Sequence, residues 1–145
     1  MNSPITILLA EDNPGDVFLV RRALEKHGLQ EVELVVVEDG QSALRYIESV
    51  DAEEDLVAPT LAMLDLNLPR ATGTRILSKI RQSTRCGAIP IIIVTSSDSP
   101  MDRDAAAELG ATAYFQKPGD LAGFMQLGKV VREALNGQAS QSAGK

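Results

Sequence analysis

A small set of polar residues in this 145-residue chain lies directly at the ends of short apolar runs. Three of them are carboxylates, one is an amide, one a hydroxyl and one an amine. Carboxylates that are held together repel one another and raise one another's pKa, so something positive is expected beside them. The set comprises Glu11, Asp12, Asp65, Asn67, Thr95 and Lys117.

The types of donor in this set select among metals. With one histidine, His27, and one cysteine, Cys86, the sequence offers too few nitrogen and sulfur ligands for a zinc site. Oxygen ligands select a hard cation, and Mg²⁺ suits one or two carboxylates together with a backbone carbonyl and waters. The sequence therefore predicts a magnesium site.

Asp65 is a candidate nucleophile beside such an ion. A carboxylate is ionised at pH 7 and needs no base to attack. Attack on a phosphoryl group would give an aspartyl phosphate, with the metal and Lys117 neutralising the phosphoryl oxygens and Thr95 donating a hydrogen bond. The sequence contains no glycine-rich phosphate loop, so ATP is not the expected donor.

Each residue also has an ordinary structural interpretation. Glu11 and Asp12 could favour the start of the next helix through its dipole. Asp65 could form a turn, Thr95 could cap a strand end, and Lys117 could be a surface charge. The joint pattern favours a functional site, because structure alone gives no reason to bring three acids together.

Alternating strands and helices are expected to position these residues. Four apolar runs predict strands buried on both faces, at residues 5–10, 33–37, 61–64 and 90–95, and a shorter fifth run covers residues 113–116. Helical spacing predicts helices over residues 14–26, 40–50, 72–80, 102–109 and 120–135. Gly28 is expected at the C-cap of the first helix and Thr72 at the N-cap of the third.

This order of elements is typical of an α/β fold. Strand followed by helix, five times over, predicts a doubly wound, five-stranded parallel sheet in the flavodoxin-like order 2-1-3-4-5, with five helices. Ligands of such sheets bind beyond the carboxyl ends of the strands, which is where the polar set falls. We expect one domain over residues 1–137 and a disordered tail over residues 138–145, which are small and polar.

Composition excludes several classes of partner. The net charge is −6 and no basic run occurs, so we expect no nucleic-acid surface. The apolar run at residues 5–10 is too short for a signal peptide, and no segment approaches membrane-spanning length. Cys86 has no partner for an internal disulfide, which fits a reducing compartment. We therefore expect a cytoplasmic protein without membrane contact.

Residues 4–135 resemble the receiver domain of two-component response regulators. The matching motifs are E-D at 11–12, L-D-L-N-L-P at 64–69, Thr95, and K-P at 117–118. The resemblance implies that Asp65 is the phosphoacceptor for a sensor histidine kinase, and that Thr95 and Lys117 respond to the phosphoryl group. The Mg²⁺ ligands that it implies are Glu11, Asp12, Asp65 and the backbone carbonyl of Asn67.

Two further features depend on this resemblance. Tyr114 matches the family's switch aromatic, which turns inward when Thr95 shifts toward the phosphoryl group; its ordinary interpretation is a half-buried strand-end tyrosine. E-D-N-P-G-D at 11–16, D-G-Q-S-A-L at 39–44 and L-N-L-P-R at 66–70 resemble the small single-domain regulators of phytochrome-type histidine kinases. A bacteriophytochrome is thus one candidate partner, and the signal would leave through protein contact.

Three classes of function remain open. The leading one is a phosphorylation-dependent switch that catalyses only its own phosphorylation and dephosphorylation. The second is an aspartyl-phosphate phosphatase or phosphotransferase, which usually has a second Asp two residues after the nucleophile, where this chain has Asn67. The third is a receiver-like binding module that is never phosphorylated, which loss of an acid or of the lysine would favour.

The region of the last strand and helix raises the question of assembly. Related regulators often dimerise there, so the resemblance implies a homodimer involving Phe115, Phe124 and Met125. Ordinary core packing is the alternative, and the helical spacing of Phe124 favours it.

Overall fold

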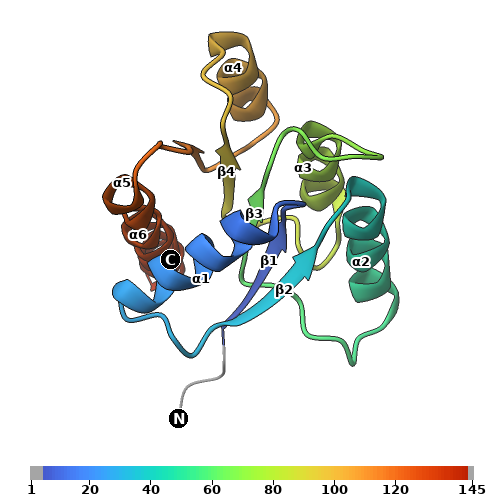
Figure 1. Ribbon diagram of the computed structural model, residues 1–145. Coiled ribbons are helices and arrows are strands. Elements are labelled where there is room, and N and C mark those ends of the chain that lie inside the picture. Colours follow the sequence, from blue (N-terminus) through green and yellow to red (C-terminus); the bar gives the residue numbers. More distant parts are fainter. Residues whose placement is uncertain (1–4, 144–145) are drawn as a thin grey trace.

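The architecture was obtained from a computed structural model, in which residues 5–143 are described, with side chains for residues 5–137 (Figure 1). The strands are β1 (Thr6–Ala10), β2 (Glu33–Val37), β3 (Leu61–Leu64), β4 (Ile91–Thr95) and β5 (Ala113–Gln116). The helices are α1 (Pro14–Lys26), α2 (Gly40–Ala52), α3 (Gly73–Gln82), α4 (Pro100–Glu108), α5 (Leu121–Met125) and α6 (Leu127–Ala143).

The five strands form one parallel sheet in the order β2-β1-β3-β4-β5, which confirms the predicted topology. Helices cover both faces: α1, α5 and α6 lie on one side, and α2 and α3 lie on the other (Figure 1). Because all strands run the same way, their carboxyl ends meet at one edge of the sheet. That edge carries the polar set.

The sheet is a rigid platform because its central strands are buried on both faces. Along β1, Ile7 and Leu9 pack toward α1, α5 and α6, whereas Leu8 and Ala10 pack toward α2 and α3. The prediction of burial on both faces is confirmed for β1, β3 and β4. It is wrong for β2, which is half-buried because it is an edge strand with a neighbour on one side only.

Capping residues fix the helix starts that surround the site. Asn13 Oδ1 accepts hydrogen bonds from the backbone N–H groups of Gly15 (2.8 Å) and Asp16 (3.2 Å) at the start of α1. Gly28 follows the end of α1 with φ of +80°, as its predicted capping position requires. Thr72 occupies the N-cap of α3, but its hydroxyl pairs with the Thr74 hydroxyl instead of capping the helix.

The last predicted helix differs from expectation in its bounds. A turn at Gln126 divides it into α5 and α6, and α6 runs to Ala143, beyond the predicted end at residue 135. The backbone of residues 138–143 is therefore helical, while residues 144–145 lie outside the described residues. The disordered tail over residues 138–145 stays a prediction.

The aromatic residues of β5 and α5 pack inside the domain. Phe124 is 3% exposed, and its ring meets that of Phe115 edge-on with centroids 6.1 Å apart. Met125 is also buried. Core packing thus accounts for these side chains, and the homodimer stays a prediction. Over residues 5–143, no helix combines the length and the apolar character that crossing a bilayer requires.

Candidate functional site

The ends of four strands hold the backbone of the site. The hydrogen-bond ladder continues one residue past β1 and β3, since Glu11 N donates to Val37 O (2.9 Å) and Asp65 N donates to Ala10 O (3.1 Å). Lys117 N donates to Thr95 O (2.7 Å) in the same way after β5. These residues therefore share the rigidity of the sheet, although the chain separates Glu11 from Lys117 by more than a hundred residues.

A glycine allows α3 to begin directly against the end of β3. Gly73 N donates to Leu66 O (3.2 Å), and a Cβ at this position would overlap the carbonyl oxygen of Asp65. Only a residue without a side chain allows this close approach. Gly73 thus helps to position Asp65 through the backbone.

Three carboxylates meet at this edge of the sheet. Glu11, Asp12 and Asp65 each offer an oxygen, and these atoms all lie within 4.8 Å of one another. Glu11 is 2% exposed and Asp65 is 7% exposed, whereas Asp12 is exposed to solvent. The cluster is therefore partly desolvated but open on the side of Asp12.

Lys117 lies at the centre of the charges. Its ammonium nitrogen is 2.7 Å from Glu11 Oε1, 2.7 Å from Asp16 Oδ2 and 3.1 Å from Asp65 Oδ2. Asp12 makes no ion pair with Lys117 among the described residues but belongs to the same carboxylate cluster, so the site holds four carboxylates and one ammonium group. The site has an excess of negative charge, which favours a bound cation.

Burial and pairing shift the pKa values of Glu11 and Lys117. Burial raises the pKa of Glu11 above its ordinary value, and the hydrogen bond and charge of Lys117 offset part of this rise. For Lys117, burial alone would lower the pKa, but its hydrogen bonds with Asp16 and Glu11 and the charge of Asp65 raise it well above its ordinary value. Lys117 is therefore charged throughout the physiological range.

Asn67 and Thr95 flank Asp65 in different ways. The backbone N–H of Asn67 donates to Asp65 Oδ1 (3.1 Å), which fixes the carboxylate and places the main chain of Asn67 beside it. Thr95 is fully buried, and its Oγ1 accepts a hydrogen bond from Ser97 N (3.4 Å). Among the described residues, Thr95 makes no hydrogen bond to Asp65.

Tyr114 is tied to the segment between β4 and α4. Its hydroxyl donates to the carbonyl oxygen of Ser97 (3.1 Å), and the Arg103 guanidinium lies 4.6 Å from the ring centroid. The Ser97 hydroxyl in turn donates to Asp102 Oδ2 (2.6 Å). Thr95 therefore contacts the backbone N–H of Ser97, and Tyr114 contacts the backbone carbonyl of Ser97.

Sequence reasoning missed Asp16 as a member of the site. The structure brings the predicted side chains of Glu11, Asp12, Asp65 and Lys117 together and adds Asp16 through Lys117. Of the other two predicted residues, Asn67 joins Asp65 through its backbone N–H and Thr95 joins Lys117 through a backbone hydrogen bond. An acid in the first turn of a helix is common because it favours the helix dipole, so its type and position gave no reason to single it out. The only signal was the density of acids in residues 11–16.

The donor set fits a hard divalent cation. Carboxylate and carbonyl oxygens are the ligands that Mg²⁺ and Mn²⁺ accept, and the clustered acids lie at the solvent-accessible end of the sheet. This chemistry supports a divalent-metal site without distinguishing between the two ions.

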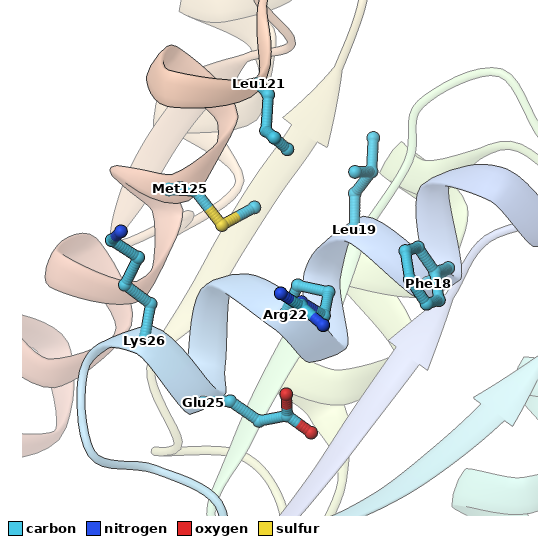
Figure 2. A pocket seen from close by; sticks show the side chains of 7 residues that line it. All are labelled: Phe18, Leu19, Arg22, Glu25, Lys26, Leu121 and Met125. Carbon is cyan, nitrogen blue, oxygen red and sulfur yellow. The ribbon is translucent and has the colours of Figure 1, made fainter.

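A groove lies between α1 and α5 on one side of the site. It has a volume of about 560 Å³, and the side chains of Leu121 and Met125 project from α5 toward α1 (Figure 2). Phe18 and Leu121 are 59% and 62% exposed, so apolar surface on both α1 and α5 is open to solvent here. Leu121 follows Lys117 by four residues and Phe18 follows Asp16 by two, so short stretches of chain link the groove to the acidic site.

Comparison with known proteins decides the family. The protein-family model of the response regulator receiver domain matches residues 7–128 of this chain. The chain belongs to this family. Response regulator Rcp1 of Synechocystis sp. is 33% identical over 120 residues, covering 83% of this chain and 81% of Rcp1.

Solved receiver domains share the same architecture. The phosphorylated cyanobacterial phytochrome response regulator RcpA superimposes with a TM-score of 0.80 at 29% identity, covering 90% of this chain and 93% of RcpA. The Mn²⁺-bound form of Rcp1 gives a TM-score of 0.77 at 30% identity, covering 88% and 91%. The bacteriophytochrome response regulator RtBRR gives a TM-score of 0.73 at 33% identity, covering 92% of this chain and 78% of RtBRR. This receiver domain thus resembles response regulators of phytochromes.

Proposed function

We propose that this receiver domain accepts a phosphoryl group on Asp65 from a histidine kinase, in a Mg²⁺-dependent reaction, and signals in the cytoplasm by a conformational switch and protein contact. One observation carries the proposal. The nearly buried carboxylate of Asp65 lies within 4.8 Å of the Glu11 and Asp12 oxygens and 3.1 Å from the Lys117 ammonium. A nucleophile, a cation site and a fixed positive charge therefore meet at one point.

The chemistry requires little beyond this geometry. The Asp65 carboxylate attacks the phosphorus, the new O–P bond forms as the P–N bond of the phosphohistidine breaks, and the electron pair remains on the imidazole nitrogen. Lys117 pairs with the phosphoryl oxygens. When bound, Mg²⁺ supplies positive charge that offsets the charge of those oxygens. The residues that would hold it are Glu11, Asp12, Asp65 and the backbone carbonyl of Asn67.

The contacts around Ser97 support the switch. A shift of the Thr95 hydroxyl toward a phosphoryl group on Asp65 would draw it away from Ser97 N, in the segment whose carbonyl also holds the Tyr114 hydroxyl. A change at Thr95 therefore alters the environment of Tyr114. Phosphorylation would act by shifting the population of these two arrangements.

The partner that we propose is a phytochrome-type histidine kinase, because RcpA and RtBRR are response regulators of phytochromes. Turnover of a separate phosphorylated substrate is not part of the proposal. Asn67 stands two residues after Asp65, and its amide cannot protonate a leaving group as a general acid would.

The test is transfer from an autophosphorylated phytochrome-type histidine kinase to wild type and to Asp65→Asn. We expect acid-labile, hydroxylamine-sensitive label on wild type and none on the variant. Asp55→Asn serves as a control, because this exposed acid lies in the loop between α2 and β3. Label on Asp65→Asn at the wild-type level would reject Asp65 as the acceptor.

A further inference from the structure

One of the three partners of Lys117 lies outside the proposed metal ligands. The ammonium contacts Glu11, Asp65 and Asp16, and the two shortest distances, both 2.7 Å, are those to Glu11 and Asp16. The side chain of Asp16 is 22% exposed and that of Lys117 is 10% exposed. Asp16 thus forms a partly buried ion pair with Lys117 that the proposed chemistry does not use.

The ammonium group has a fixed number of donors. Lysine carries three N–H donors and no acceptor, and here three carboxylates take one donor each. A cation that binds Glu11 and Asp65 offsets much of the negative charge on both carboxylates and so weakens their ion pairs with Lys117. A charged amine that loses its partners in a partly buried place is costly, so Lys117 needs a partner that the cation does not use.

We propose that Asp16 is a positioning residue for Lys117. Asp16 keeps the Lys117 ammonium at the site while Glu11 and Asp65 bind a divalent cation. The inference rests on the proposed function, from which it takes the metal ligands. Without the charge of Asp16, the ammonium would stay on Glu11 and Asp65, and the cation would have to displace it. Asp16 therefore lowers the competition between Lys117 and the metal.

The local structure holds Asp16 in place for this role. Its backbone N–H donates to Asn13 Oδ1 (3.2 Å) in the first turn of α1. Favouring the helix dipole would require only that the acid be in this turn. The dipole does not account for a 2.7 Å contact with Lys117, a residue of a distant strand end.

The experiment is a calorimetric Mg²⁺ titration of wild type, Asp16→Asn, Lys117→Met and the double variant. We expect Asp16→Asn to weaken Mg²⁺ binding about fivefold when Lys117 is present and less than about twofold in the Lys117→Met background. Glu38→Gln is the matched control. Glu38 is exposed and lines the same cavity as Glu11 and Asp12, but within the described residues it makes no ion pair with Lys117. Glu38→Gln therefore measures the effect of removing one nearby negative charge.

Two further measurements keep the test specific. Thermal unfolding of each variant identifies any loss of folding, and Asp16→Glu, which keeps the charge, should recover most of the affinity. The NMR signal of the Lys117 ammonium should remain detectable at saturating Mg²⁺ in wild type and broaden away in Asp16→Asn, because exchange with water is faster for an unpaired amine.

The outcomes separate this inference from the proposed function. Equal losses of affinity with and without Lys117 would overturn the role of Asp16 and leave the metal site intact. Absence of saturable Mg²⁺ binding in wild type would overturn the metal part of the proposed function, and the role of Asp16 with it.

Discussion

Asp12 differs from the other acids of the site because it is exposed and has no ion-pair partner among the described residues. Glu11 and Asp65 both contact Lys117, whereas Asp12 contributes repulsion as long as no cation is bound. Functional sites often contain residues that bind a ligand well but destabilise the domain when that ligand is absent. Stability and metal binding should therefore respond to Asp12 in opposite directions.

The corresponding prediction concerns Asp12→Asn. Without divalent metal, removal of this charge should raise the free energy of unfolding by about 1 kcal/mol, the Coulomb repulsion of two charges at this separation in a watery environment. At saturating Mg²⁺ the order should reverse, because wild type gains more from the metal. Urea unfolding with and without Mg²⁺ checks both statements, with Glu108→Gln on α4 as the control. A variant less stable than wild type without metal would contradict this view.

At the scale of elements, a polar cluster joins the end of α2 to the segment after α3. Asp51 Oδ1 accepts from the Ser83 hydroxyl (2.7 Å) and from Arg85 N (3.1 Å), and Arg85 Nη1 donates to the Val50 carbonyl (2.7 Å). The Ser83 hydrogen bond is the main cause that lowers the pKa of Asp51 below its ordinary value of 3.8. This cluster lies away from the acidic site.

Asp51→Ala should therefore destabilise the domain without affecting metal binding. We expect a loss of about 1 kcal/mol at pH 7, the usual contribution of such hydrogen bonds at a partly exposed position. Because the folded-state pKa is lowered, this contribution is complete above pH 3.8 and disappears as the pH falls through the folded-state pKa. Denaturant unfolding between pH 7 and pH 3 measures the difference. Asp55→Ala, an exposed acid nearby, is the control, and a difference that grows on acidification would contradict the assignment.

The elements also show how far sequence reasoning reaches. The strand order and the convergence of polar residues from four strand ends could be predicted, because parallel strands with alternating helices fix which ends meet. The partial burial of β2 could not, since its apolar run resembles those of the central strands and only its edge position exposes it. The ion pair of Asp16 with Lys117 depends on side-chain directions that residue spacing does not specify.

At the scale of the whole molecule, the proposed transfer from a histidine kinase would bring a partner protein against the surface around Asp65. The groove between α1 and α5 is lined by the exposed side chains of Phe18 and Leu121 and by the charged side chains of Arg22, Glu25 and Lys26 (Figure 2). A kinase that reaches Asp65 from this side would bury apolar surface there. We expect this groove to contribute to kinase contact but not to the chemistry.

Phe18→Ala should then slow transfer from the kinase about tenfold, the usual effect of truncating a central apolar contact in an interface. Phosphorylation by acetyl phosphate, which needs no protein contact, should be unchanged. Val57→Ala is the matched control, because Val57 is 67% exposed but lies in the loop between α2 and β3, at the amino ends of the strands. Equal slowing with both donors would place the effect of Phe18 in the site itself.

The most direct test of the central claim is the intact mass of wild type and Asp65→Asn after incubation with acetyl phosphate and Mg²⁺, with and without EDTA. The proposed chemistry predicts a gain of one phosphoryl group in wild type only, and only when the metal is available. A gain in Asp65→Asn, or one that persists in EDTA, would contradict the assignment of Asp65 and its cation site. So would the absence of any gain in wild type if the kinase donor also fails.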